Sequence, residues 1–469
     1  MPVEQINLIR GDKVSQDTDY RDSLPVNMYA VNRQIFSALG YMLCYPGLTL
    51  ITTGSGIDRA GIYNERFDAH FRVSGNKLTQ LKPNGSSVEL GTIPGTSQAS
   101  MPYSFNTQAI IANGNMYLYS PASGLAAITD TDLGSPIDGI WIDGYYFLTD
   151  GEYLYHTDID DETAIDPLKF ATAEFSPDKT IALGKTQDNK VAVFGRYTTE
   201  YFVDVATANF AFQRIESRAQ KIGVVATHAK CELGGNFYIV GSRKEESLGV
   251  HVVGLGQTVK VSTREIDKIL AGYNERELTD IRVESREEDN NYLILIHLPN
   301  ETLLFNESIG KTIGASAAWS ILKTDIDGTT PHRAINGVSD TRRGEWIYGD
   351  RYNSNIGKLD NTVFSQYDEA IELEITTPLM KVEGASIDEI EVETIPGHNV
   401  NDDATVAISI TYNGFTYGHE WYEMYGEPLD YNKRFIIRRL GYVPNVFGVK
   451  LRSATTSRMS FASLRITYG

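Results

Sequence analysis

Two glycine-containing segments could bind phosphate if the rest of their motifs were present. Gly310-Lys311-Thr312 matches the end of a phosphate-binding loop, but Phe305 stands where that motif has its first glycine. Gly254-Leu255-Gly256 lacks the third glycine of a dinucleotide-binding loop, and its flanking segments read as strands. Both motifs need a strand–loop–helix unit that the sequence does not predict. We therefore expect no nucleotide chemistry at either segment.

Histidines and cysteines could ligate zinc, but their spacing does not favour it. His419-Glu420 is followed by Glu423 where a zinc-protease helix would have its second histidine, and the segment reads as a strand. His228 and Cys231 have finger-like spacing without a second pair. The other histidines are scattered along the sequence; examples are His70, His156 and His297. His297 lies in an apolar strand, where a hydrogen-bonded core histidine is the preferred interpretation.

Carboxylates are abundant, and one cluster could bind a cation. A calcium loop counted from Asp158 would need Gly at position 163 and Glu at position 169, where the sequence has Thr163 and Lys169. A solvated acidic loop is therefore preferred over a weak cation site. A glycosidase would need two carboxylates about 5 to 9 Å apart, and no local motif indicates such a pair. The acidic cluster comprises Asp158, Asp160, Asp161, Glu162 and Asp166.

The densest basic cluster is Lys433, Arg434, Arg438 and Arg439. On a strand these residues divide between the two faces, so they make no continuous basic stripe. A charged strand edge, or ion pairs with nearby acidic strands, is preferred over a docking site for an acidic partner or for phosphate. Arg10-Gly11-Asp12 matches a cell-adhesion tripeptide, which a chain of this length contains by chance.

Composition excludes several classes of protein. The 469 residues are 41% hydrophobic and carry a net charge of −19, which argues against gripping nucleic-acid backbones or anionic membranes. Cys44 and Cys231 are the two cysteines, so a disulfide-built scaffold is excluded and two reduced thiols are expected. The polar stretch from Met1 to Asp19 lacks the apolar core of a signal peptide, and no run is long enough to span a membrane. We expect folding in the cytoplasm and no membrane anchor.

The elements that would position these residues are strands. Gly, Tyr and Phe number 41, 27 and 18, which is typical of an all-β protein. Hairpins start roughly 30 to 55 residues apart, near the blade period of a propeller, and radial closure would remove exposed edges. The predicted hairpins pair 115–119 with 125–129, 145–149 with 153–156, 191–194 with 200–203, 237–240 with 249–253, 292–298 with 302–305, and 346–348 with 356–359.

One helix is predicted, with Ser262 as N-cap, Glu265 completing a capping box, and an apolar face that includes Ile266, Ile269 and Leu270. A second short turn is predicted over 275–281.

The pattern changes after Tyr367. A run of short predicted strands follows, which predicts a β-sandwich. We therefore expect an all-β fold with a β-propeller-like domain at 1–367, including the N-terminal segment, and a C-terminal β-sandwich at 368–469. The predicted strands cover 369–380, 386–394, 405–412, 415–422, 435–440, 447–451 and 459–468, with an acidic loop from Pro396 to Asp403.

An ordered set of short motifs spans nearly the whole chain. The motifs are Leu24-Pro25-Val26-Asn27-Met28, Gly40-Tyr41, Pro46-Gly47, Glu200-Tyr201-Phe202, Ile296-His297-Leu298-Pro299, Trp319, Leu322-Lys323-Thr324, Ser365-Gln366-Tyr367-Asp368, Thr377-Pro378-Leu379, Tyr431, Lys433-Arg434, Arg438-Arg439, Gly448 and Lys450-Leu451-Arg452. In this order they resemble one family, the packaged-DNA stabilisation proteins (tail hubs) of P22-like short-tailed bacteriophages.

The resemblance implies a structural virion protein without catalytic, cofactor-binding or metal-binding residues. It implies a homo-hexameric ring below the portal and its adaptor ring, which helps to retain packaged DNA and carries tailspikes or fibres and the tail needle. Double-stranded DNA would pass through the channel without sequence-specific binding, and an acidic channel wall would not hold it. The alternative is a carbohydrate-binding or carbohydrate-active propeller, whose many tyrosines would suit sugar stacking.

Overall fold

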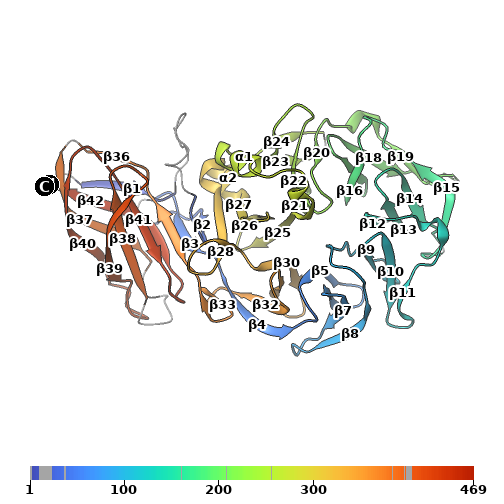
Figure 1. Ribbon diagram of the computed structural model, residues 1–469, viewed down its shortest axis with the longest axis horizontal. Helices are drawn as coiled ribbons and strands as arrows, with labels where there is room; N and C mark the ends of the chain where they lie inside the picture. The colour runs from blue at the N-terminus through green and yellow to red at the C-terminus, as the bar shows by residue number, and fades with distance from the viewer. Residues whose placement is uncertain are drawn as a thin grey trace. The chain divides into compact units, whose positions relative to one another are not determined.

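The computed structural model describes residues 3–9, 24–35, 38–159, 161–207, 209–254, 256–382, 384–395, 397 and 404–469. The chain divides into two compact units (Figure 1). Unit 1 comprises Met1–Thr49, Arg286–Arg333 and Leu359–Gly469, and unit 2 comprises Leu50–Ser285 and Ala334–Lys358. Strands β4 (Gly47–Thr53), β25 (Arg282–Glu288) and β32 (Asn355–Asp360) each contain a point where the chain passes between the units.

Unit 2 is a series of small antiparallel sheets, most of them formed from strands close together in the sequence; the exception is the sheet that contains β32, in which β4 lies beside that strand. The sheets are β5 (Asp58–Asn64), β6 (Ala69–Ser74), β7 (Lys77–Leu81) and β8 (Ser87–Thr92); β9 (Gln108–Ala112), β10 (Asn115–Ser120) and β11 (Gly124–Ala127); β12 (Asp138–Ile142), β13 (Tyr145–Thr149), β14 (Leu154–Thr157) and β15 (Ile165–Ala171); β16 (Thr180–Lys185), β17 (Val191–Gly195), β18 (Thr199–Asp204) and β19 (Phe212–Arg214); β20 (Gly223–Val224), β21 (Lys230–Leu233), β22 (Asn236–Ser242), β23 (Gly249–Val253) and β24 (Thr258–Lys260); and β30 (Ala334–Asp340), β31 (Glu345–Asp350) and β32.

The turn between β13 and β14 shows how the sequence sets these hairpins. Asp150 Oδ1 accepts hydrogen bonds from the backbone N–H groups of Glu152 and Tyr153, at 2.9 and 2.7 Å. Gly151 has a φ of +99°, which glycine adopts without steric cost. The Asp-Gly pair therefore reverses the chain where the sequence predicts a turn. All six predicted hairpins are confirmed, with ends that shift by one or two residues at most positions.

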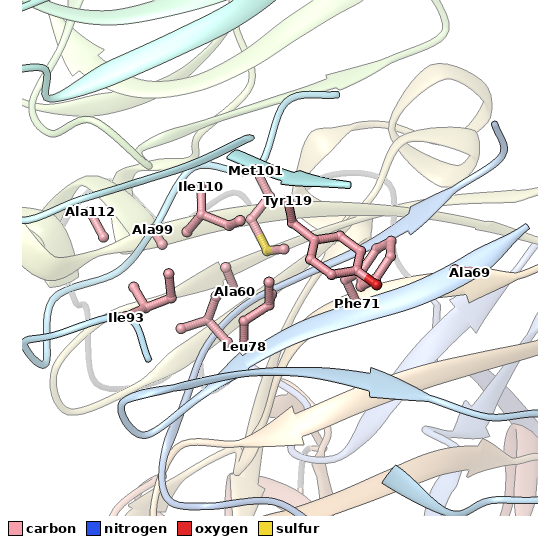
Figure 2. Close-up of a cluster of buried hydrophobic side chains, with 11 residues drawn as sticks. Ala60, Ala69, Phe71, Leu78, Ile93, Ala99, Met101, Ile110, Ala112 and Tyr119 are labelled. Atoms are coloured by element: carbon pink, nitrogen blue, oxygen red, sulfur yellow. The ribbon is translucent and has the colours of Figure 1, made fainter. Parts of the chain in front are cut away.

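Apolar clusters fill the spaces between successive sheets of unit 2. The first includes Phe71 from β6 and Tyr119 from β10, whose rings meet edge to face with centroids 5.4 Å apart (Figure 2). Strand β17 lies between two such clusters: Val191 and Val193 belong to one, and Ala192 belongs to the next. Because both faces of β17 are covered, the strand is apolar throughout instead of alternating.

Unit 1 contains two sheets built mainly from C-terminal strands. One has the order β2 (Met28–Val31), β3 (Tyr41–Cys44), β42 (Ser460–Tyr468), β37 (Ala385–Thr394) and β40 (Phe435–Val443), and β1 (Val3–Asn7) also pairs with β42. The other has the order β35 (Leu373–Thr376), β41 (Val446–Ser453), β38 (Thr405–Thr411) and β39 (Tyr417–Met424), with β36 (Met380–Lys381) beside β41.

The predicted C-terminal strands are confirmed, except that the first is divided among three short strands, β34 (Glu369–Ala370), β35 and β36. The sequence did not indicate that β1 and β3 would pair with β42. Most of the predicted loop from Pro396 to Asp403 lies outside the described residues. Unit 1 also holds β26 (Asn291–His297), β27 (Thr302–Asn306), β28 (Trp319–Thr324), β29 (Thr330–Pro331) and β33 (Ser365–Gln366).

The predicted helix is α1 (Arg264–Ala271), which buries Ile266 and Leu270. Its N-cap is Thr263 and not Ser262 as predicted, because the Ser262 hydroxyl accepts from Val250 N–H and donates to Asp267. The predicted turn near 275–281 is a 3-10 helix, η4 (Glu277–Asp280). Two unpredicted short helices follow β27: α2 (Glu307–Thr312) and α3 (Ala315–Ala318). In the described part of the chain, no helix has both the length and the apolar character that crossing a membrane requires.

Candidate functional site

The segments with partial phosphate motifs have structural roles. Gly310-Lys311-Thr312 is the end of α2, which follows β27 directly, so no loop is available to surround a phosphate. A Cβ atom at Gly310 would lie 2.9 Å from the Phe305 ring, so this glycine permits close packing. Gly254 donates its N–H to the Gln257 carbonyl in the turn after β23, and Leu255 lies outside the described residues.

The candidate metal ligands do not come together. His419, Glu420 and Glu423 lie on β39, a strand as predicted. Burial, reinforced by the charges of Arg282 and Lys230, holds the pKa of His228 at about 3. Among the residues that the structure describes, no group of three His, Cys, Asp or Glu side chains could hold a metal ion. His297 is buried, as predicted for a core histidine. The Arg10-Gly11-Asp12 tripeptide lies outside the described residues.

The acidic cluster is engaged locally. Lys169 Nζ lies 2.8 Å from Asp158 Oδ1, and Asp161 Oδ1 accepts hydrogen bonds from the backbone and hydroxyl of Thr163. Asp160 lies outside the described residues. The lysine that the sequence places where calcium would need a glutamate therefore forms an ion pair with the first carboxylate of the cluster.

The basic cluster lies on and beside β40, an edge strand, and forms ion pairs with its neighbour β37. Arg434 Nε lies 2.6 Å from Glu391 Oε1, and Arg438 Nε lies 2.9 Å from Glu389 Oε2. Lys433 Nζ is 4.0 Å from Glu423 Oε1. This is the ion-pair interpretation that the sequence favoured.

A cavity of about 820 Å³ in unit 2, here called the basic cavity, is a site that sequence reasoning missed. Strands from several successive sheets line it, among them β5, β12, β16 and β21, together with the segment 99–105. Its side chains include four cations against two carboxylates, although the whole chain is acidic. No short motif could have revealed it, because its charged lining residues are Glu65, Arg66, Asp138, Lys185, Lys230 and Arg282.

The basic cavity has one saturated carboxylate. Asp138 accepts hydrogen bonds from the Ser100 hydroxyl at 2.6 Å and the Leu183 N–H at 2.8 Å, and it lies 3.1 Å from Lys230 Nζ. Lys185 Nζ lies 5.4 Å from the centre of the Trp141 ring, a cation–π contact. The cavity therefore combines fixed positive charge with an aromatic wall.

A second polar centre joins β5 and β6 to β30 and β31. We call it the closure network; its members are Asp58, His70, Arg72, Asn336, Asp340 and Arg342. Arg72, fully buried on β6, donates to both Asp58 carboxylate oxygens at 2.8 and 2.9 Å. The same guanidinium donates to the Asn336 carbonyl at 3.0 Å and to the Ile347 carbonyl at 3.4 Å.

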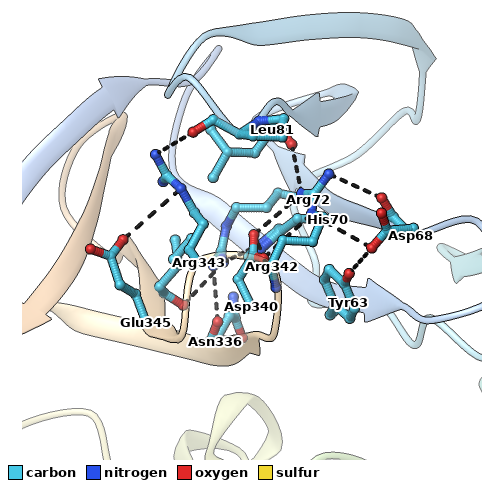
Figure 3. Close-up of polar contacts among 12 residues, drawn as sticks. Tyr63, Asp68, His70, Arg72, Leu81, Asn336, Asp340, Arg342, Arg343 and Glu345 are labelled. Atoms are coloured by element: carbon cyan, nitrogen blue, oxygen red, sulfur yellow. Dashed lines mark hydrogen bonds and ion pairs between the residues drawn. The ribbon is translucent and has the colours of Figure 1, made fainter.

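The end of β30 supplies Asp340 to the closure network, and the loop between β30 and β31 supplies Arg342 (Figure 3). Arg342 donates to the backbone carbonyls of Asp68 and Leu81, at 3.0 and 3.3 Å. His70 Nδ1 lies 3.3 Å from Asp340 Oδ2, and both side chains are fully buried. Strands separated by more than 250 residues in the sequence are thus held together by these polar contacts and by an apolar cluster of Leu81, Ile347 and Ile356. Between the consecutive sheets the contacts are mainly apolar clusters.

The electrostatics of the closure network follow from its burial. Burial holds the pKa of His70 at about 4, against the opposing effect of Asp340. Burial would raise the pKa of Asp340, but hydrogen bonds from His70 and Arg342 outweigh it and hold that pKa at about 2. His70 is therefore neutral and Asp340 ionised at neutral pH.

Comparison with known proteins gives matches along the chain. The family model described as bacteriophage P22 Gp10, β-propeller, matches residues 4–364, and that described as bacteriophage P22 Gp10, β-sandwich, matches residues 372–469. The tail hub protein gp10 of Salmonella phage P22 is 30% identical to this chain over 99% of both proteins.

Solved structures similar to this chain include two enzymes at low identity. A streptogramin B lyase is 10% identical, with 67% of this chain and 97% of the lyase covered and a TM-score of 0.42. The virginiamycin B lyase of Staphylococcus aureus is 9% identical, with 76% and 98% covered and a TM-score of 0.41. Because both TM-scores are below 0.5, no argument about activity follows from them. The two family models, which together match most of the sequence, identify this chain as a member of the bacteriophage P22 Gp10 family, with a β-propeller followed by a β-sandwich.

Proposed function

We propose that this protein is a phage tail hub, a structural component of the virion tail that acts by binding and not by catalysis. The observation that carries the proposal is the match to a tail hub protein over 99% of both chains. The fold is suited to such a role, because sheets covered on both faces form a rigid support for many surface loops.

The finer proposal is that six copies form a ring below the portal and its adaptor ring, helping to retain packaged DNA. The ring would carry tailspikes or fibres and the tail needle. Each chain carries a charge of −19, so an acidic channel wall would let DNA pass without fixed contacts. The proposed domains are 1–367 and 368–469, which the family matches at 4–364 and 372–469 support.

A structural role is also supported by the carboxylates of the basic cavity. Of the two that line it, Asp138 is paired with Lys230 and saturated by hydrogen bonds. A glycosidase needs one carboxylic acid and one free carboxylate facing a substrate bond. The cavity is therefore better suited to binding than to hydrolysis.

The test is electron microscopy of assembled tails that contain this chain. We expect six copies in a ring that contacts the adaptor, and a calculated potential along the channel that is not continuously basic. Mass photometry of the purified chain should show monomers that assemble only when the adaptor ring is added. Stable hexamers of the isolated chain at nanomolar concentration would contradict this order of assembly, and turnover of a glycan would contradict the structural role.

A further inference from the structure

We propose that the basic cavity of unit 2 binds a ring-shaped ligand that carries one carboxylate, the chemistry of a uronic acid. This inference does not rest on the tail-hub proposal, because it follows from the cavity alone. A volume of about 820 Å³ lies within the range of about 300 to 1,000 Å³ typical of small-molecule sites.

The first argument is uncompensated positive charge. Lys185 contacts the Trp141 ring and has no carboxylate partner within the described residues. Arg282 uses Nε to reach Glu284, at 3.3 Å, while its buried Nη1 has no hydrogen-bond partner in the described part of the chain. A buried donor without a partner is costly, and an anionic ligand would satisfy it.

The second argument is the aromatic wall. Phe105 is 64% exposed although it lines the cavity, and its ring meets the edge of Trp141 with centroids 4.9 Å apart. Tyr103 belongs to the same wall. Aromatic faces pack against the apolar faces of ring ligands, so this wall favours a ring over a bare ion.

The third argument selects a single carboxylate over a phosphate. Lys230 is already paired with Asp138, and Glu284 lies beside the Nε of Arg282, so part of the positive charge is compensated and less remains to bind a doubly charged phosphate. The carboxylates of Glu65 and Asp138 also line the cavity and would repel a dianion. His228, neutral at pH 7, can donate to or accept from ring hydroxyl groups.

The experiment is saturation-transfer NMR and titration calorimetry of the full chain with glucuronate, and with glucose and inorganic phosphate as separate ligands. We expect glucuronate to bind in the millimolar range, and both glucose and phosphate to bind at least about tenfold more weakly. If glucose bound as tightly as glucuronate, the site would not recognise the carboxylate. If phosphate bound as tightly as glucuronate, the site would not recognise the ring. Either result overturns the proposal. So does displacement of glucuronate by an equal concentration of tetraglutamate, which would indicate a peptide site.

Matched variants locate the site. Lys185→Gln removes the cation beside Trp141 and should weaken glucuronate binding about tenfold, and Trp141→Leu should weaken it by a similar factor. Lys179→Gln removes an exposed lysine that does not line the cavity and should leave binding unchanged. Because Lys185 is exposed, its variant should fold normally. Equal binding by the two lysine variants, or no binding at about 20 mM glucuronate, would overturn the proposal.

Discussion

Two charged clusters in this protein use the same residue types in opposite environments. In the closure network, Arg72 and Asp58 are both buried, and two guanidinium nitrogens of Arg72 donate to the two carboxylate oxygens of Asp58. On the β37–β40 pair, Arg438 and Glu389 meet at 2.9 Å, but the arginine side chain is 65% exposed. Removing one partner of a buried pair leaves an uncompensated charge, whereas water replaces the partner of an exposed one. Similar distances therefore imply very different contributions to stability.

The difference also concerns what each cluster connects. The closure network joins strands far apart in the sequence, so no short turn helps to hold them together. The exposed pair joins two strands that already share a long antiparallel register, from Ala385 opposite Val443 to Val392 opposite Phe435. We expect the first cluster to determine the stability of unit 2 and the second to add little to that of unit 1.

The largest expected effect is that of Arg72→Met. The change leaves the Asp58 carboxylate buried without its ion pair, and unit 2 should lose about 3 to 5 kcal/mol of unfolding free energy. Urea denaturation followed by circular dichroism measures the loss. The double variant Arg72→Met, Asp58→Leu should recover part of it, because the unpaired charge is then gone. A loss below about 1 kcal/mol in the single variant would show that the buried pair is not what closes unit 2.

A smaller effect is expected from Gly349→Ala. An added Cβ on β31 would overlap the Asp58 side chain, so the closure network would have to shift, at a cost of about 1 to 3 kcal/mol. The matched control is Gly418→Ala on β39, where the nearest atom would be the Ile410 carbonyl oxygen at 3.6 Å. That variant should change the unfolding free energy by less than about 0.5 kcal/mol. Equal losses in the two variants would remove the distinction between the regions.

The pH dependence gives a third test. The pKa of His70 is about 4 in the folded chain and near 6.5 when unfolded, so the unfolded state binds more protons between these values. The titration of His70 therefore has no effect on the unfolding free energy above pH 6.5, and the unfolding free energy falls as the pH drops from 6.5 to 4. The slope is at most about 1.4 kcal/mol per pH unit for one proton. As the pH falls from 3.8 through about 2, protonation of Asp340 removes a further contribution.

The control for this test is His70→Gln, which should flatten the slope between pH 6.5 and pH 4 in denaturation curves recorded at several pH values. The difference between the two slopes isolates His70 from the other buried histidines, such as His156 and His251, whose pKa values burial also lowers. An unchanged slope would show that His70 does not carry this pH dependence.

Much of the fold could be predicted because its signals are local. The Asp150-Gly151 turn lies between alternating or apolar runs, and the structure places a hairpin there. The pairing of β1 and β3 with β42 could not be predicted, since nothing in residues 3–7 identifies a partner more than 450 residues away. Helix α2 was missed because Asn306, which caps it by accepting from the Ser308 N–H, is itself the last residue of the apolar strand β27, so no loop residues separate strand from helix.

The candidate site was less predictable because its residues come from strands that are far apart in the sequence. The conclusions about single motifs rested on spacing; Glu423 lies in a strand, as predicted, whereas Gly310 lies in a short helix that the sequence did not predict. Lys185, Lys230 and Arg282 line the basic cavity from three separate sheets. In the sequence these three residues lie far from one another, in a chain that is acidic overall. Only the tertiary fold makes them neighbours, so no residue spacing in the sequence could have predicted the site.

The smallest expected effect is that of Arg438→Gln. The exposed guanidinium gains little from Glu389 in high-dielectric surroundings and gives up side-chain freedom to hold the pair. The unfolding free energy should fall by about 0.5 kcal/mol or less at low salt, and the difference should vanish near 1 M NaCl, where the screening length is about 3 Å. Urea denaturation at both salt concentrations measures it. A salt-independent loss as large as that of Arg72→Met would mean that burial does not separate the two clusters, and that charge pairing itself stabilises both regions.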